Sequence, residues 1–318
     1  MERIRGKILV IRGGAIGDFI LTLPAIAALR RQFPEAHLEV LGYPHIIQLA
    51  VAGGLVDRVQ SIEARALAGF FARHGQLEED LADYFSEFDI IISYLYDPDD
   101  IFRANIARCS PAHFIVGPYR PNEREKVHAT KVYLQPLERL AIFEADNLPR
   151  LSINSLSAAA PAKADQPPTL SQIALHPGSG SEKKNWPEEK WADLLQHLVN
   201  STNFNLLLIG GEAEGERLQR LAAALPPRRT RVAQSLPLAE LARLLQQCTA
   251  FVGHDSGISH LAAALGLPGI VLWGNSIEQI WRPPHEQVVV LKNPGGIRLI
   301  PVELVVQKLN AIAAAAKP

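Results

Sequence analysis

One loop near the start of the chain sets a single carboxylate among glycines. Residues 12–18 read Arg-Gly-Gly-Ala-Ile-Gly-Asp and open the first helical pattern. Asp18 has two interpretations: it is the N-cap of a helix beginning near Phe19, or it is a carboxylate placed to take a proton from a hydroxyl. One side chain could do both. A dinucleotide site is not indicated, because Arg12 occupies the first glycine position of G-x-G-x-x-G and the second strand ends at Gly42 without an acidic residue.

A second loop combines small residues with ammonium groups. Residues 177–187 read Pro-Gly-Ser-Gly-Ser-Glu-Lys-Lys-Asn-Trp-Pro, and a proline is typical of the first turn of a helix. Backbone N–H groups, the Ser179 hydroxyl and the Lys184 ammonium suit a bound phosphate. The spacing does not match a P-loop, because no Gly-Lys-Ser/Thr follows. A solvated surface loop is the alternative.

The most specific segment is residues 251–260, Phe-Val-Gly-His-Asp-Ser-Gly-Ile-Ser-His. A buried strand runs into Asp-Ser-Gly and then into a helix of Leu and Ala. We expect Asp255, Ser256 and Gly257 to present free backbone N–H groups at the helix N-terminus, which attracts anions. A glycine there lets a pyrophosphate approach without meeting a Cβ. The alternative is that Asp255 and Ser259 only cap the helix.

An acidic loop follows another strand, where residues 208–217 read Leu-Ile-Gly-Gly-Glu-Ala-Glu-Gly-Glu-Arg. These acidic residues have two interpretations. Acidic side chains are common in the first turn of a helix because the helix dipole stabilises them. Alternatively, one carboxylate at the end of the strand accepts hydrogen bonds from two ribose hydroxyls. His176, His254 and His260 are interpreted as structural hydrogen-bonding residues. No metal site is predicted, because their spacing matches no zinc motif and no H-E-x-x-H occurs.

These loops need regular elements to hold them, and short β-rich runs alternate with helical patterns along the chain. Strands are expected at 7–12, 38–42, 58–62, 88–94, 114–117, 172–176, 204–210, 250–253, 268–274 and 288–291. Helices are expected at 20–33, 187–200, 214–225, 238–246, 259–265 and 302–315. Unbroken apolar runs such as Ile90-Ile91-Ile92 are typical of parallel strands buried on both faces. The pattern predicts doubly wound α/β sheets, which bind ligands outside the carboxyl ends of their strands.

Length and composition set the scale of the molecule. A chain of 318 residues favours two domains, and the Ser/Ala/Pro-rich segment 152–171 is expected to link them. The expected domains are residues 1–160 and 161–318, with the final helix a candidate to pack back on the N-terminal domain. The net charge of -1 argues against a nucleic-acid partner. Cys109 and Cys248 lie far apart and are interpreted as small buried residues of a reducing compartment.

No targeting or membrane-spanning segment is expected. The apolar run at residues 8–11 is too short for the core of a signal peptide and suits a first strand. No stretch approaches the roughly 18 to 20 apolar residues that a transmembrane helix needs. The sequence predicts a cytoplasmic protein, with peripheral contact at the inner face of the cytoplasmic membrane left open.

Four motifs in order resemble glycosyltransferase family 9, the heptosyltransferases of lipopolysaccharide core assembly. Residues 17–24, Gly-Asp-x-x-x-Thr-Leu-Pro, are similar to the opening G-D-x-x-x-T-x-P of that family. Residues 184–187 resemble its K-x-W-P, and residues 210–214 resemble its loop to the ribose. Residues 255–261 resemble D-[ST]-G-x-x-H-L, which is the strongest signal. The resemblance covers nearly the whole chain.

The resemblance implies a GT-B fold, with two Rossmann-like doubly wound domains facing each other across a cleft. The N-terminal domain would bind the acceptor and the C-terminal domain the nucleotide sugar. It implies an inverting, metal-independent transfer of a heptose or related sugar from an ADP-sugar, usually ADP-heptose, to a hydroxyl of a lipopolysaccharide-core or lipid-linked glycan. No cofactor is implied, since the nucleotide sugar is a substrate.

The resemblance also assigns roles to single residues. Asp18 would be the general base, Lys184 would neutralise a phosphate of the departing ADP, and Glu214 would hold the ribose. Asp255 and the N–H groups that follow it would grip the pyrophosphate and sugar. The implied donor-binding set is Ser179, Lys184, Glu214, Asp255, Ser256, Gly257 and His260.

The family motifs identify no acceptor-binding residues in this sequence. Arg120 and Lys126 are candidates to meet acidic groups of the acceptor, but they match no motif of the family, and solvated surface charges are the alternative. Two other functions stay open. A nucleotide-sugar 2-epimerase-like enzyme would bind the same donor without an acceptor. A non-catalytic nucleotide-sugar-binding protein would keep the phosphate loops and use Asp18 only as a cap.

Overall fold

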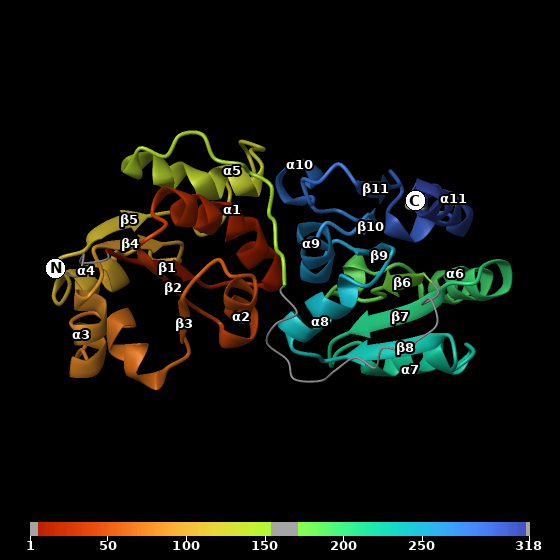
Figure 1. The fold of residues 1–318 in the computed structure, drawn as a ribbon, viewed down its shortest axis with the longest axis horizontal. Helices are drawn as coiled ribbons and strands as arrows, with labels where there is room; N and C mark the ends of the chain where they lie inside the picture. Colours follow the sequence, from red (N-terminus) through yellow and green to blue (C-terminus); the bar gives the residue numbers. More distant parts are fainter. Residues whose placement is uncertain (1–5, 154–170, 316–318) are drawn as a thin grey trace. The chain divides into compact units, whose positions relative to one another are not determined.

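Two compact units make up the chain, Met1–Ser152 and Ile153–Pro318 (Figure 1). The computed structural model describes residues 6–153 and 171–315, so most of the expected linker and the expected boundary at residue 160 lie outside the described residues. Each unit is built on one parallel sheet. In the described ranges, no helix combines the length and the apolar character needed to cross a membrane.

The N-terminal unit has a five-stranded sheet in the order β3-β2-β1-β4-β5, and every pairing is parallel. Its strands are β1 (Lys7–Arg12), β2 (His37–Gly42), β3 (Arg58–Ser61), β4 (Ile90–Ser93) and β5 (His113–Val116). The chain winds outward from β1 to β3 and then returns to place β4 on the other side of β1. This reversal is a topological switch point, where α/β sheets open a crevice at the strand carboxyl ends.

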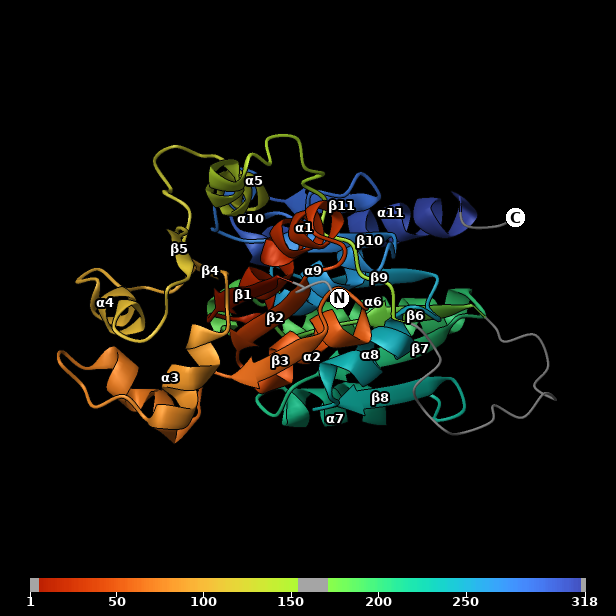
Figure 2. The same ribbon diagram turned by 60° about the vertical axis from the view of Figure 1, so that its left-hand side comes forward.

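Helices cover both faces of this sheet (Figures 1 and 2). They are α1 (Ile16–Gln32), α2 (Pro44–Ala52), α3 (Glu79–Ser86), α4 (Ile101–Ala107), α5 (Ala129–Leu134) and the 3₁₀ segments η1 (Arg65–Phe71) and η2 (Gln135–Leu140). Leu9 and Ile11 of β1 pack into one apolar cluster with side chains of η1, α3 and α4. Helix α1 packs against α5 and α2. The continuous apolar strands are therefore enclosed on both sides, as predicted.

The C-terminal unit has a six-stranded parallel sheet in the order β11-β10-β9-β6-β7-β8. Its strands are β6 (Gln172–Leu175), β7 (Asn205–Gly210), β8 (Thr230–Gln234), β9 (Ala250–His254), β10 (Gly269–Trp273) and β11 (Val288–Lys292). The winding reverses between β6 and β9, which places the switch point of this unit there. Strand β8 was not predicted, because it is an edge strand in which Ala233 alone is buried.

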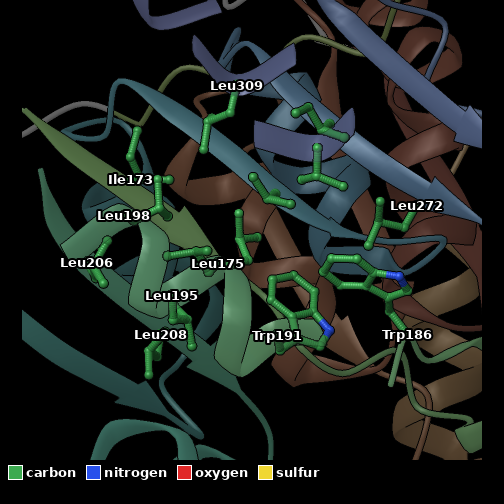
Figure 3. Packing of buried hydrophobic residues seen from close by; sticks show 14 of the residues in the cluster. Ile173, Leu175, Trp186, Trp191, Leu195, Leu198, Leu206, Leu208, Leu272 and Leu309 are labelled. Atoms are coloured by element: carbon green, nitrogen blue, oxygen red, sulfur yellow. The ribbon is translucent and has the colours of Figure 1, made fainter. Parts of the chain in front are cut away.

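Helices also enclose this second sheet. They are α6 (Glu188–Ser201), α7 (Gly215–Ala223), α8 (Leu238–Leu245), α9 (Gly257–Ala264), α10 (Glu278–Trp281), α11 (Val302–Ala315) and the 3₁₀ segments η4 (Glu182–Lys184) and η5 (Ile297–Leu299). Alternate residues of β10 divide between the two faces. Ile270 and Leu272 join the core that α6, α7 and α11 cover (Figure 3), whereas Val271 and Trp273 pack with Ala263 of α9.

The final helix contributes to the core of its own unit. Val305 and Leu309 of α11 are fully buried in the cluster that includes Ile173 and Leu198 (Figure 3). Helix α11 packs against α6 and β10. This apolar contact accounts for the buried face of the helix within the C-terminal unit.

The two cysteines are free thiols in different surroundings. Cys248 is buried, and its burial raises the pKa of its thiol to about 12. Cys109 is half-buried, so full burial was predicted wrongly for it. It packs against the apolar cluster that contains Leu9 and Ile11 of β1.

Candidate functional site

A partly buried ion pair joins two loops at the switch point of the C-terminal unit. The Nζ of Lys184, in the loop after β6, lies 2.7 Å from Oδ2 of Asp255, which directly follows β9. The Ser276 hydroxyl also donates to that carboxylate oxygen. The Asp255 side chain is 9% exposed and that of Lys184 is 41% exposed, so the ammonium group still reaches solvent. This arrangement presents a partly exposed ammonium group at the strand carboxyl ends.

Helix α9 begins directly beside this pair. Ser256 is its N-cap, and the Ser256 hydroxyl accepts from the backbone N–H of Ser259 at 3.4 Å. The interpretation that Asp255 caps the helix is wrong, because Asp255 lies one residue before the cap and its carboxylate binds Lys184 instead. Free N–H groups of the first turn and the helix dipole favour an anion at this end. His260 is buried on the same helix.

The phosphate-type loop, residues 177–186, is held at both ends by one imidazole. The Trp186 backbone N–H donates to Nε2 of His254 at 2.9 Å, which leaves Nδ1 to donate to the Gly178 carbonyl at 3.0 Å. His254 is fully buried, and burial lowers the pKa of its imidazole to about 3. The ring is therefore neutral at pH 7. This geometry agrees with the structural interpretation of His254.

The Ser179 hydroxyl forms its hydrogen bonds within its own loop. Its Oγ lies 2.9 Å from the Ser181 carbonyl and 2.7 Å from Oδ1 of Asn185. A hydroxyl has one proton, and both neighbours are acceptors, so the Ser179 proton is used within the loop. The structure thus places Ser179 in the predicted loop as part of its framework.

Glu214 lies next to the same loop although it comes from the segment after β7. Its side chain is buried, and its Oε2 accepts from the Gly211 backbone N–H at 2.9 Å. A Cβ at position 178 would lie 2.2 Å from Cγ of Glu214, so only a glycine leaves room for this carboxylate. Helix α7 begins at Gly215, one residue after the predicted start. Three loops of the C-terminal unit therefore meet at one place.

Arg217 is a residue of this region to which the sequence reasoning assigned no role. Its guanidinium donates to the Pro177 carbonyl at 3.3 Å and to both carboxylate oxygens of Glu182 at 2.8 Å. It thereby ties α7 to the loop after β6. No local pattern marks it, because an arginine in a helical first turn is ordinary in sequence.

In the N-terminal unit, Asp18 lies in the first turn of α1. Helix α1 begins at Ile16 with Ala15 as its N-cap, so the prediction that Asp18 is the N-cap of a helix starting near Phe19 is wrong. Asp18 occupies the third helical position, and its Oδ2 accepts from the Ala15 backbone N–H at 3.0 Å. This is one half of a capping box. The side chain is 31% exposed, so the carboxylate can reach a ligand while it caps the helix.

Arg12 organises the surroundings of Asp18. Its side chain is 2% exposed, and its Nη2 lies 3.6 Å from Oδ1 of Asp18. Its Nη1 donates to the Tyr119 carbonyl at 2.9 Å, and its guanidinium lies 4.5 Å from the ring centre of Tyr133. The sequence reasoning used Arg12 only to exclude a dinucleotide site. A charged residue that ends a fully apolar strand is the signal that could have identified it.

The two predicted acceptor residues lie at the surface of the N-terminal unit. Arg120 is exposed and forms an ion pair with Glu123 at 2.7 Å. Lys126 is exposed and has a left-handed backbone with φ 54°. Their role in acceptor binding stays a prediction. Across residues 6–153 and 171–315, His, Cys, Asp and Glu side chains form no group of three or more that could hold a metal ion.

Comparison with known proteins relates the chain to one family. The family model for glycosyltransferase family 9 (heptosyltransferase) matches residues 127–296. Lipopolysaccharide heptosyltransferase 3 of Escherichia coli is 22% identical over 293 residues, which cover 84% of this chain and 83% of that protein.

Solved structures share the fold. The structure of Escherichia coli ADP-heptose lipopolysaccharide heptosyltransferase II has a TM-score of 0.78 at 19% identity, covering 97% of this chain and 99% of that one. Escherichia coli heptosyltransferase WaaC with ADP has a TM-score of 0.73 at 21% identity, covering 96% and 100%. Together with the two parallel sheets, these matches confirm the predicted GT-B fold class.

Proposed function

The chain belongs to glycosyltransferase family 9 (heptosyltransferase), and we propose that it transfers a heptose from ADP-heptose to a hydroxyl of a lipopolysaccharide-core glycan, with inversion at the anomeric carbon. The observation that carries this proposal is the Lys184–Asp255 pair beside the N-terminus of α9, at the switch point of the C-terminal sheet. Two similar proteins support the donor, because one is a lipopolysaccharide heptosyltransferase and the other is a heptosyltransferase solved with ADP.

The C-terminal unit supplies the groups that a departing ADP needs. The Lys184 ammonium and the first-turn N–H groups of α9 offer positive charge to a diphosphate, which would stabilise the negative charge that develops as the C1–O bond to phosphate breaks. Asp255 would keep Lys184 directed at this position. The buried carboxylate of Glu214 would accept the ribose hydroxyls.

The N-terminal unit supplies the base. In the proposed step, the acceptor hydroxyl gives its proton to the Asp18 carboxylate, the acceptor oxygen bonds to the anomeric carbon, and ADP leaves from the opposite face. Inversion requires this geometry, with the base on one face and the stabilised leaving group on the other. The half-buried position of Asp18 supports this role, because the carboxylate is held by Ala15 and Arg12 yet still reaches solvent.

Lys184 and a helix N-terminus can perform the charge stabilisation that a divalent metal performs in other enzymes. We therefore propose a metal-independent reaction with no cofactor. The acceptor hydroxyl would belong to a lipid-linked or core glycan. The reaction would then take place in the cytoplasm, with the acceptor presented at the inner face of the cytoplasmic membrane.

The proposal is tested by ligand preference and by turnover. ADP should raise the melting temperature more than UDP or GDP at equal concentration, and a preference for UDP or GDP would overturn the proposed donor. ADP-heptose incubated with core oligosaccharide should yield ADP and a product heavier by one heptose. Isomerisation of the donor without an acceptor would indicate an epimerase, and binding without turnover would indicate a non-catalytic protein.

A further inference from the structure

Two tyrosine rings stand exposed beside the switch point of the N-terminal sheet. Tyr96 follows β4 and is 67% exposed, whereas Tyr119 follows β5 and is 49% exposed. Their ring centres are 4.6 Å apart, and their planes meet edge to face at 63°. In such a pair the partner leaves at least one face of each ring uncovered. We call these two side chains the tyrosine pair.

The backbone that carries the tyrosine pair is held firmly. The Arg12 guanidinium donates to the Tyr119 carbonyl at 2.9 Å and to the Tyr94 carbonyl at 3.4 Å. The carboxylate of Asp97, the residue after Tyr96, accepts from two backbone N–H groups at the start of α4, at 3.0 and 3.1 Å. The exposed rings therefore project from an ordered edge, and ordered aromatic surface costs little conformational entropy when a ligand binds.

The same arginine contacts both the Tyr119 backbone and the proposed base. Nη2 of Arg12 lies 3.6 Å from Oδ1 of Asp18, while Nη1 of the same guanidinium holds the Tyr119 carbonyl. One planar group thus separates the Tyr119 backbone from the carboxylate proposed to deprotonate the acceptor. Asp18, Tyr96 and Tyr119 follow β1, β4 and β5, three adjacent strands of one parallel sheet, and ligands of such sheets bind at the strand carboxyl ends.

We propose that the tyrosine pair is an acceptor subsite, on which one sugar ring of the acceptor glycan stacks its C–H face. This inference rests on the proposed function and specifies its acceptor side. Pyranose rings present a flat patch of C–H groups, which packs on an aromatic face, while their hydroxyls remain hydrated at the rim. A tyrosine suits this contact because its ring is apolar and its hydroxyl stays in water. Exposed aromatic side chains that contact each other, here in the loops after β4 and β5, indicate a binding surface more strongly than isolated ones do.

The test uses the full-length protein and core oligosaccharide released from lipopolysaccharide by mild acid, so that no lipid is present. Saturation-transfer NMR should show transfer from protein aromatic protons to sugar ring protons. In the transfer assay, Tyr119→Ala and Tyr96→Ala should each raise the KM for the oligosaccharide about tenfold, with kcat changed much less. Tyr119→Phe should stay close to the parent protein, because the ring remains.

Phe143→Ala is the matched control, since Phe143 is a 73% exposed aromatic of the same unit. It should leave the KM unchanged. The rise in melting temperature with ADP should be the same in all variants, which shows that the fold and the donor side are intact. Equal KM values in the parent and both alanine variants would overturn the subsite, as would the absence of aromatic saturation transfer in the parent protein.

The outcomes also separate this inference from the proposed function. If the parent protein binds the oligosaccharide through the tyrosine pair but transfers no heptose, the proposed function fails and the subsite stands. If transfer is normal and both alanine variants match the parent, only the subsite fails. Binding to anionic phospholipid vesicles that both alanine variants lose, with an unchanged KM for the oligosaccharide, would assign the tyrosine pair to a lipid surface and overturn the sugar assignment.

Discussion

Lys184 donates to Asp255 at 2.7 Å across the point where the C-terminal sheet reverses its winding. The two residues are 71 positions apart, and each follows a strand that borders the switch point. The pair is neutral overall, but it holds the partly exposed Lys184 ammonium, with N–H donors to spare, beside the N-terminus of α9.

Replacing Lys184 should weaken ADP binding. Lys184→Ala removes a charge-assisted contact to the diphosphate, and such contacts are worth about 1.5–3 kcal/mol, so the Kd for ADP should rise about ten- to hundredfold. Isothermal titration with ADP measures this change. Lys183→Ala is the matched control, because Lys183 is the exposed neighbour in the same loop. Equal affinity in both variants would remove Lys184 from the donor site.

Replacing Asp18 should abolish chemistry and spare donor binding. The amide oxygen of Asp18→Asn can still accept from the Ala15 N–H, so α1 should keep its first turn, but an amide cannot take the acceptor proton. We expect kcat to fall about 10²- to 10⁴-fold with the thermal shift by ADP preserved. Asp80→Asn, at an exposed first-turn position of α3, is the control. Turnover near that of the parent protein would show that Asp18 is not the base.

Arg12 is expected to act through Asp18 as a positioning residue. Arg12→Lys keeps the charge but loses the planar fork that contacts Asp18 and the Tyr119 carbonyl together. We expect kcat/KM for the acceptor to fall about tenfold, since both the base and the acceptor side lose their geometry. The Kd for ADP should not change. A change confined to melting temperature, with full activity, would make Arg12 purely structural.

Gly178 should be intolerant of any side chain because of Glu214. A Cβ at Gly178 would meet Glu214 Cγ at 2.2 Å, so Gly178→Ala must displace the carboxylate or the loop. ADP affinity should drop at least as much as in Glu214→Gln, and both are measured by titration. Gly6→Ala is the control, since a Cβ there meets its nearest atom at an ordinary 3.5 Å. Unchanged affinity in Gly178→Ala would argue against Glu214 as a ribose ligand.

The stability of the C-terminal unit should decrease in acid because of His254. Its pKa is lowered from the ordinary value of 6.5 to about 3, so below pH 6.5 the unfolded chain binds a proton that the folded chain does not. Stability contributed by this imidazole is therefore lost as the pH falls from 6.5 toward 3, at about 1.4 kcal/mol per pH unit. Burial also lowers the pKa of His176, which adds to the same trend.

Urea unfolding at pH 7.5 and pH 5.0 measures this effect. All four tryptophans lie between residues 186 and 281, so tryptophan fluorescence follows the C-terminal unit alone. His254→Gln should lower the midpoint at pH 7.5 and reduce the difference between the two pH values. His197→Gln, at a partly exposed position of α6, serves as the control. If the urea midpoint fell between pH 7.5 and pH 5.0 by as much in His254→Gln as in the parent protein, His254 would not be the source of the acid sensitivity.

Much of the fold could be predicted because it depends on neighbours in sequence. Unbroken apolar runs such as 90–92 identify parallel strands buried on both faces, and the loops that follow such strands lie at one edge of a sheet by the geometry of the fold. The strand β8 escaped prediction because a half-exposed edge strand lacks this apolar signal. The start of α1 was misplaced because Ala15, its N-cap, has no capping side chain.

The family and the four loops therefore follow from residue types and spacing alone, whereas the contacts that assemble the site do not. Arg12 reaches the Tyr119 carbonyl 107 positions away, and His254 binds the Trp186 N–H across 68 positions. The partners of a long side chain depend on strand order and on the direction of each loop, and no local pattern records either. Tertiary structure thus decided that Asp255 pairs with Lys184 instead of capping α9, and that one guanidinium, that of Arg12, contacts both Asp18 and the Tyr119 carbonyl.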